Sequence, residues 1–219
     1  MTIESGFASP PLGATTPPVI AVLRAPHADL YGPVAETMSE NGINAIELTM
    51  STPGAIESIA SIRTRIDSRT RIGIGTVTDV REVRRAVTAG VDFIVTPTTN
   101  LSVIRAAVSA GIPIYPGGLT PTELWAGWNA GATAVKIFPA SLVGPDMIAH
   151  LRGPFPDIQV IPSGGIDLAA ATAWMAAGAL SVSVGGPLVG DAFKGGSLSE
   201  LATRCRSVIE AVNTAGATS

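Results

Sequence analysis

Apolar runs that fit buried strands alternate along this chain with longer, alanine-rich stretches that fit helices. The alternation begins at Val19, and the stretches between the runs are roughly 10–15 residues long. A strand followed each time by a helix is typical of a parallel sheet built from βα units. The predicted strands span Val19–Leu23, Ala45–Thr49, Arg71–Gly75, Phe93–Thr96, Ile114–Tyr115, Ala134–Phe138, Gln159–Pro162 and Leu180–Val184.

Several predicted helices end alike, with a glycine that is followed at once by the next strand. Glycine is favoured there because the residue after a helix often takes a left-handed conformation. The repetition indicates one unit used throughout, and predicts a single-domain (β/α)8 TIM barrel of the α/β class. A doubly wound open sheet is the alternative, but the dinucleotide-like segment Gly73–Thr76 lacks the third glycine of that fingerprint. The glycines are Gly42, Gly90, Gly111, Gly131 and Gly178.

Residues 1–18 show little periodicity and contain Pro10, Pro11, Pro17 and Pro18. We expect a loose arm or a short cap, followed by the barrel over residues 19–219. The first residues also lack the basic-then-apolar pattern of a secretory signal.

Composition narrows the classes of partner. Hydrophobic residues make up 46% and charged residues 14%, so the core is ample and part of the surface is neutral or in subunit contacts. With net charge −3 and no basic run, we expect no nucleic-acid or membrane partner. No apolar stretch approaches the ~18 residues of a membrane span. The single cysteine, Cys205, cannot form an internal disulfide, which fits a reducing cytoplasm. We expect it to be a helix-packing residue.

Lys136 is the most informative residue for chemistry. By count, 12 of the 14 basic residues are Arg, leaving only Lys136 and Lys194, and Lys136 lies inside a predicted strand. A buried ammonium is costly to desolvate and tends to lose its proton. The neutral amine is a nucleophile that forms Schiff bases with carbonyl compounds. The alternative is a buried lysine paired with a carboxylate and without chemistry.

Period-two alternation places Lys136 and Glu47 together. In a barrel the carboxyl ends of the strands form the active-site face, and alternation turns Glu47 and Thr49 inward with Lys136. The inward Gly73 and Gly75 are expected to leave room beside the lysine. Glu47 either moves protons during chemistry on the amine, or forms a purely structural ion pair with it.

Other strand ends offer binding groups. Arg24 either takes a substrate carboxylate or phosphate, or forms a salt bridge to Glu47. Thr76 either donates to a carboxylate or caps the helix that begins near Asp79. Glycine pairs after the last two strands offer backbone N–H groups to phosphate, in Ser163-Gly-Gly165 and at Gly185–Gly186.

The remaining aromatic and histidine side chains carry less information. Trp125 and Trp128 are three residues apart on one predicted helix, which indicates packing or a subunit contact. His27 lies near Arg24, while His150 is expected at the surface.

These motifs resemble the 2-keto-3-deoxy-6-phosphogluconate aldolases and their 6-phosphogalactonate and 4-hydroxy-2-oxoglutarate relatives. The resemblance implies a (β/α)8 class I aldolase with no metal or cofactor, acting on a small molecule and commonly a homotrimer. It runs from about Val19 to Gly190 and is carried by Val22-Leu-Arg24, Ile46-Glu-Leu-Thr49, Gly73-Ile-Gly-Thr-Val77, Ile94-Val-Thr-Pro97, Tyr115-Pro-Gly117, Val135-Lys-Ile-Phe-Pro-Ala140, Pro162-Ser-Gly-Gly-Ile166 and Val184-Gly-Gly186.

By position, the resemblance makes Lys136 the Schiff-base lysine and Glu47 the general acid/base. The expected reaction cleaves a 2-keto-3-deoxy-6-phospho sugar acid to pyruvate and glyceraldehyde 3-phosphate. The expected substrate-binding residues are Arg24, Thr49, Thr76, Pro97, Phe138, Ser163, Gly164, Gly165, Gly185 and Gly186.

Two departures keep other substrates open. Ser51 stands where the gluconate-type enzymes carry an arginine, and Pro187 stands where the family often has a phosphate-binding serine. A non-phosphorylated 2-keto acid such as 4-hydroxy-2-oxoglutarate is one alternative. Two alternative functions also stay open. One is a phosphosugar epimerase or isomerase without a covalent intermediate, and the other is a phosphosugar-binding regulatory barrel.

Overall fold

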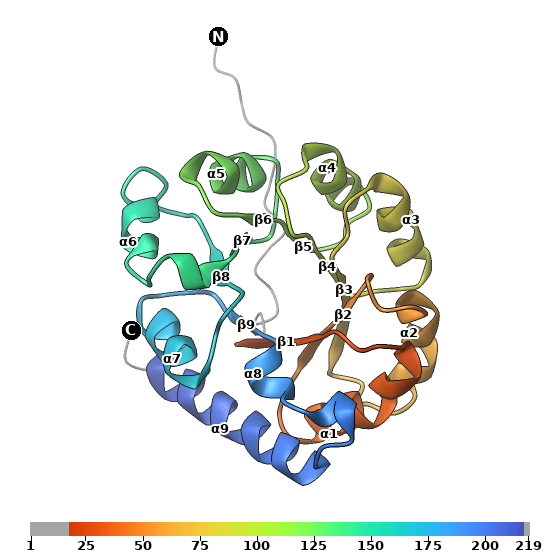
Figure 1. The fold of residues 1–219 in the computed structure, drawn as a ribbon. Helices are drawn as coiled ribbons and strands as arrows, with labels where there is room; N and C mark the ends of the chain where they lie inside the picture. Colours follow the sequence, from red (N-terminus) through yellow and green to blue (C-terminus); the bar gives the residue numbers. More distant parts are fainter. Residues whose placement is uncertain (1–17, 217–219) are drawn as a thin grey trace.

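The computed structural model describes residues 18–216, so nearly all of the predicted N-terminal arm lies outside the described residues. Figure 1 shows the strands arranged around a common centre, with helices outside them. The strands are β1 (Val19–Leu23), β2 (Ala45–Thr49), β3 (Arg71–Gly75), β4 (Phe93–Val95), β5 (Ile114–Tyr115), β6 (Gly117–Gly118), β7 (Val135–Ile137), β8 (Val160–Pro162) and β9 (Val182–Val184).

The helices follow the strands in turn. They are α1 (Tyr31–Glu40), α2 (Ala55–Arg63), α3 (Val80–Thr88), α4 (Leu101–Ser109), α5 (Pro121–Asn129), α6 (Met147–Arg152), α7 (Leu168–Ala176), α8 (Gly186–Val189) and α9 (Leu198–Gly216). Short 3-10 helices are η1 (Ala28–Leu30), η2 (Ala140–Leu142) and η3 (Ala192–Lys194). In the described part of the chain, no helix is long and apolar enough to cross a membrane.

All paired strands are parallel. One sheet has the order β5-β4-β3-β2-β1-β9 and the other β6-β7-β8. Leu180 N donates to Val160 O at 3.0 Å, and Ser163 forms a parallel bridge with Ser183, so β8 and β9 are in contact. In a doubly wound sheet helices cover both faces, whereas here α1 to α7 and α9 lie outside a curled set of strands (Figure 1). The predicted α/β fold with a parallel sheet is confirmed.

The strand predictions are close to the observed bounds. Four match as stated, and the other four are one or two residues shorter than predicted. The short strand β6 was not predicted, because Pro116 followed by two glycines is typical of a turn. It pairs with β7 in the register Gly117 with Lys136, and so lies directly beside the lysine.

Two apolar clusters confirm the predicted alternation. Ile46, Leu48, Val135 and Ile137 belong to the large cluster that the strands form with the helices. A smaller cluster comes from the opposite faces of the strands, as expected when successive side chains point to opposite sides. Its buried members are Ile20, Ala45, Phe93, Val95, Tyr115, Ala134 and Ile161.

The predicted helix ends are confirmed as well. The five glycines at these ends all have positive φ, between 70° at Gly111 and 94° at Gly131. Trp125 stacks on Phe155 with 4.3 Å between ring centroids, which confirms its packing role. His150 is exposed on α6, as expected.

Gly90 isolates the effect of backbone conformation on stability. Its φ is 72°, and no heavy atom lies within 4 Å of a Cβ added there. We expect Gly90→Ala to lower the free energy of unfolding by about 1–2 kcal/mol, because only the left-handed backbone opposes the side chain. Urea denaturation measures the change.

Gly144→Ala is the matched control. An added Cβ there also meets nothing within 4 Å, but φ is outside the left-handed region. We expect it to leave stability unchanged or raise it by up to about 1 kcal/mol. Equal losses in the two variants would contradict the backbone explanation.

Candidate active site

Lys136 lies at the centre of β7, between β6 and β8. Its backbone N donates to Pro116 O at 2.8 Å, and the residue is only 7% exposed. Its Nζ is 4.9 Å from the centroid of the Phe138 ring, so one side of the amine faces an aromatic surface. Burial lowers the pKa of the Lys136 ammonium below its ordinary value; the charge of Glu47 opposes this shift and that of Arg24 adds to it.

Glu47 projects from β2 and is 3% exposed. Burial raises the pKa of its carboxyl, while the charges of Lys136 and Arg24 act in the opposite direction. Each group therefore senses the other's charge. None of the ion pairs among the described residues joins Glu47 to Lys136, so the predicted alternative of a direct structural ion pair is wrong.

The inward glycines of β3 have a different use from the one predicted. A Cβ at Gly73 would collide with the Phe93 ring, and a Cβ at Gly75 would collide with the Glu47 carboxylate. The space above these glycines is therefore occupied by Phe93 and Glu47, and is not free room beside Lys136. Gly75 allows the carboxylate of Glu47 to lie close to the β3 backbone.

Arg24 follows β1 and is exposed. Its Nη1 donates to Ser51 Oγ at 2.7 Å. None of the ion pairs among the described residues joins Arg24 to Glu47, so the alternative of a salt bridge between them is wrong. Ser51 in turn lies 3.4 Å from the hydroxyl of Thr49, which is fully buried at the end of β2. Ser51, which sequence reasoning noted only as a departure from a family pattern, thus holds the guanidinium near the catalytic candidates.

A second group of contacts joins the ends of β1 and β2. Thr52 Oγ1 donates to Ala25 O at 3.0 Å and accepts from Ala25 N at 3.2 Å. Tyr31 in α1 donates its hydroxyl to Leu23 O at 3.2 Å. Neither Thr52 nor Tyr31 was predicted near the site. The sequence carries no signal for either contact, because only the folded chain brings these side chains to the carbonyl groups.

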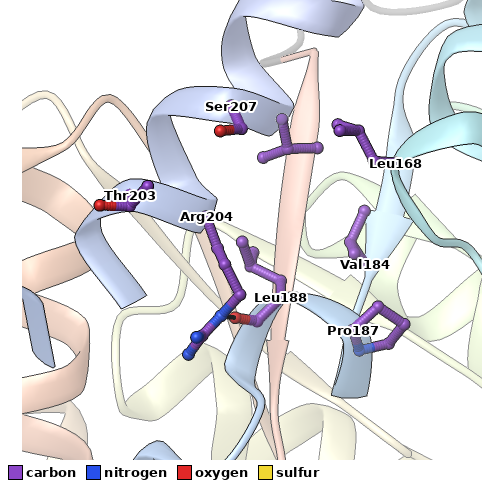
Figure 2. A pocket seen from close by; sticks show the side chains of 8 residues that line it. Leu168, Val184, Pro187, Leu188, Thr203, Arg204 and Ser207 are labelled. Atoms are coloured by element: carbon purple, nitrogen blue, oxygen red, sulfur yellow. Dashed lines mark hydrogen bonds between the residues drawn. The ribbon is translucent and has the colours of Figure 1, made fainter. Parts of the chain in front are cut away.

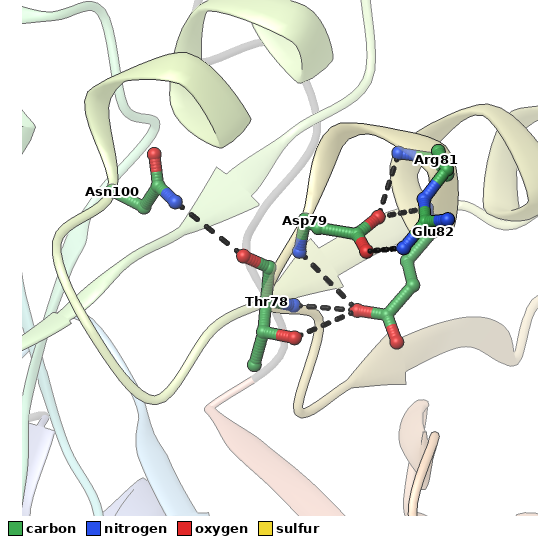
Figure 3. Close-up of polar contacts among 5 residues, drawn as sticks. All are labelled: Thr78, Asp79, Arg81, Glu82 and Asn100. Carbon is green, nitrogen blue, oxygen red and sulfur yellow. Dashed lines mark hydrogen bonds and ion pairs between the residues drawn. The ribbon is translucent and has the colours of Figure 1, made fainter.

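Thr76 follows β3 with φ of 63°. A β-branched residue is strained in this region, and such strain is concentrated at functional sites. Thr76 does not cap α3, so that alternative is wrong. Asp79 is the N-cap, and its side chain accepts from Arg81 N and Glu82 N (Figure 3). The Glu82 carboxylate in turn accepts from Asp79 N.

The loop after Thr76 is tied down on both sides. Thr78 donates its N–H to Glu82 at 2.6 Å, and Asn100, the N-cap of α4, donates to Thr78 O at 3.4 Å (Figure 3). These bonds fix the backbone that presents Thr76.

The other predicted binding residues also lie at the strand ends. Pro97 is half-buried after β4, where a Cβ at Gly117 would meet its carbonyl oxygen at 2.6 Å. Phe138 is 37% exposed, and its ring lies against Gly164. Ser163 is buried and donates its hydroxyl to Ser183 Oγ at 3.2 Å.

Pro187 belongs to α8, where a missing N–H is tolerated in the first turn. Its ring borders an apolar pocket of about 230 Å³ between α7, α8 and α9, together with Leu168 and Val184 (Figure 2). Gly185 and Gly186, by contrast, line a different cleft of about 550 Å³ that also contains Arg24. Lys194 lines this second cleft and was left unassigned by sequence reasoning.

Several known proteins are similar to this chain. The family model described as "Aldolase: KDPG and KHG aldolase" matches residues 13–202. A probable 2-dehydro-3-deoxy-6-phosphogalactonate aldolase from Rhizobium meliloti is 31% identical, over 92% of this chain and 96% of its own. A solved structure of native KDPGal superimposes with a TM-score of 0.83 at 32% identity, covering 90% of this chain and 95% of its own.

A third similar protein carries chemical information. The KDPG aldolase of Legionella pneumophila, solved with pyruvate captured as a covalent carbinolamine intermediate, has a TM-score of 0.81 at 28% identity. The alignment covers 89% of this chain and 95% of that one. The chain belongs to the KDPG and KHG aldolase family. It is accordingly an aldehyde-lyase of carbohydrate metabolism, a class of enzyme that makes or breaks carbon–carbon bonds.

The lowered pKa of Lys136 can be measured directly, since the chain has only two lysines. Competitive acetylation across a pH series, read by peptide mass spectrometry, should give Lys136 a midpoint below that of Nα-acetyllysine. The sign is set by desolvation, which disfavours the ammonium. Because the Glu47 charge raises this pKa, Glu47→Gln should move the midpoint further down. A midpoint at or above that of the free amine would contradict the desolvated setting.

Proposed function

We propose that this protein is a class I aldolase that cleaves a 2-keto-3-deoxy-6-phospho sugar acid to pyruvate and glyceraldehyde 3-phosphate. The observation that carries the proposal is the buried Lys136 amine, which shares the interior with a carboxyl that is not ion-paired to it. Relatives of both the gluconate and galactonate type support the substrate class. The sheet is proposed to close as a (β/α)8 barrel, for which the contacts between β8 and β9 are the support.

In the proposed mechanism, Lys136 Nζ attacks the C2 ketone to give a carbinolamine. Loss of water forms an iminium, which withdraws electrons from the C3–C4 bond. Glu47 takes the proton of the C4 hydroxyl, the C3–C4 bond breaks, and the aldehyde leaves. The remaining enamine receives a proton at C3 from Glu47, and hydrolysis releases pyruvate and the free amine.

The pKa directions suit these roles. A lowered pKa increases the fraction of Lys136 present as the nucleophilic amine at neutral pH. A raised pKa brings Glu47 nearer to neutral pH, where a carboxyl can both accept and return a proton. Arg24, held by Ser51, is proposed to bind the C1 carboxylate, and Phe138 to cover the apolar side of the pyruvate unit.

Assembly and location remain predictions. We propose a homotrimer that works in the cytoplasm, without metal or cofactor. The low share of charged residues, 14%, supports subunit contacts over part of the surface.

Borohydride trapping tests the covalent step. Reduction in the presence of pyruvate should leave a pyruvate-derived adduct on the Lys136 peptide, identified by mass spectrometry. Lys136→Ala should abolish both the adduct and turnover, and the Lys194 peptide serves as the internal control. Folded protein without an adduct would instead favour proton-transfer chemistry without a covalent intermediate.

Glu47→Gln tests the proton-transfer role. We expect the rate of cleavage to fall by roughly 10²–10⁴-fold, because the amide cannot accept the hydroxyl proton. Circular dichroism and thermal unfolding establish that the variant is folded. Full activity in the folded variant would show that Glu47 is structural only.

A further inference from the structure

A cleft of about 550 Å³ opens beside the end of β1 and is lined largely by small residues and two cations. Lys194 comes from η3 and Arg24 from the end of β1, while the cleft floor is formed near β9 and α8. The lining residues are Val22, Arg24, Ala25, Pro26, Gly185, Gly186, Val189, Gly190, Phe193 and Lys194.

The charge of this cleft is of one sign. No aspartate or glutamate is among its lining residues, and no ion pair among the described residues involves Arg24 or Lys194. The nearest carboxylate along the chain, Asp191, lies against Gly196, where an added Cβ would collide with it. A cleft whose only charged lining residues are cations attracts anions.

The backbone that carries the exposed Lys194 is held in place relative to the end of β1. The neighbouring Phe193 packs edge-on against Tyr31, with 6.0 Å between ring centroids at an angle of 69°. The Tyr31 hydroxyl bonds to Leu23 O, directly before Arg24 in the chain. Lys194 N also donates to Asp191 O at 2.7 Å. The wall that carries Lys194 is therefore anchored to the strand that carries Arg24.

The floor of the cleft is also fixed. Arg204 in α9 donates from Nε to Leu188 O at 2.7 Å (Figure 2). It also donates from Nη2 to Val189 O at 3.0 Å, at the end of α8. No heavy atom lies within 4 Å of a Cβ added at Gly186. The space above this glycine is open, so a ligand group can reach it.

Arg24 links this cleft to the reacting pair, because it lines the cleft and its charge acts on both Lys136 and Glu47. In a 2-keto acid the C1 carboxylate is bonded directly to C2, so it must lie close to Lys136 when C2 reacts. The group at the other end of the substrate lies several bonds further on. Lys194 lines the same cleft from a different element, η3, and so suits this more distant position.

We propose that Lys194 is a specificity-determining residue that binds the anionic group at the end of the substrate remote from the keto acid. The inference rests on the proposed aldolase function and assigns the anion to a side chain. Two anions share this chemistry, a phosphate monoester and a carboxylate. The ammonium forms charge-assisted hydrogen bonds with either one.

The test compares cleavage rates of Lys194→Gln with those of the wild-type protein. Substrates are 2-keto-3-deoxy-6-phosphogluconate, its galactonate epimer, 4-hydroxy-2-oxoglutarate, and uncharged-tail 2-keto-3-deoxygluconate. For substrates with the anionic tail that the enzyme uses, we expect kcat/KM to fall about 10–100-fold, because a hydrogen bond to a charged group is lost. The fall should come from a higher KM. The uncharged-tail substrate should change by less than about twofold.

Two further variants sharpen the comparison. Lys194→Arg should retain most of the wild-type kcat/KM, because it restores the charge. Arg84→Gln, which removes an exposed cation of α3 outside the cleft, should behave as wild type. The kind of tail, phosphate or carboxylate, on which Lys194→Gln loses more of its kcat/KM identifies the anion that Lys194 binds. An equal loss on charged and uncharged tails, or no loss at all, overturns the role of Lys194.

Failure of this inference can be told apart from failure of the aldolase function. Pyruvate has no remote anion, so Lys194→Gln should still form the borohydride-trapped adduct on Lys136. An adduct together with unchanged kcat/KM on anionic substrates overturns the inference and leaves the aldolase standing. If the wild-type protein forms no adduct, inorganic phosphate remains as a probe. It should raise the thermal unfolding temperature of wild type but not of Lys194→Gln, and equal shifts overturn the inference.

Discussion

The arrangement of the site depends on keeping an amine and a carboxyl buried in one interior without letting them form an ion pair. Lys136 and Glu47 are 7% and 3% exposed, and burial moves their pKa values toward each other. A direct ion pair would hold both groups in their charged forms and remove the nucleophile. Burial of both groups without an ion pair between them therefore supplies both a free amine and a carboxyl that can carry a proton.

The surrounding structure maintains this separation. The carboxylate of Glu47 lies against the β3 backbone because residue 75 has no side chain. Ser51 engages the guanidinium of Arg24, which otherwise would be available to Glu47. The Thr52 and Tyr31 bonds at the ends of β1 and β2 fix the loops from which Arg24 and Ser51 project. The strained Thr76 is likewise held by the capping box of α3.

Much of the fold was predictable because its signals are local. Apolar runs identified β1, β2 and β3 to the residue, and glycines with positive φ marked the helix ends as expected. Period-two alternation within these runs placed Lys136 and Glu47 on inward faces. Strand β6 escaped prediction because its two glycines carry no hydrophobic signal, although it pairs with the lysine strand. Long-range side-chain bonds, such as Arg24 to Ser51 and Ser163 to Ser183, have no local signal either.

The sequence by itself determined the order of strands and helices, the inward faces and the presence of a lysine among apolar neighbours. These follow from backbone periodicity and from the cost of burying polar groups, which act over a few residues. Only the tertiary structure decided that Glu47 and Lys136 form no ion pair, and that Phe93 and Glu47 fill the space beside Gly73 and Gly75. It also decided that Lys194 shares a cleft with Arg24. Those outcomes depend on packing between segments far apart in the chain. The side chain at one strand end takes its position from the volume and charge of residues that come from several other strands.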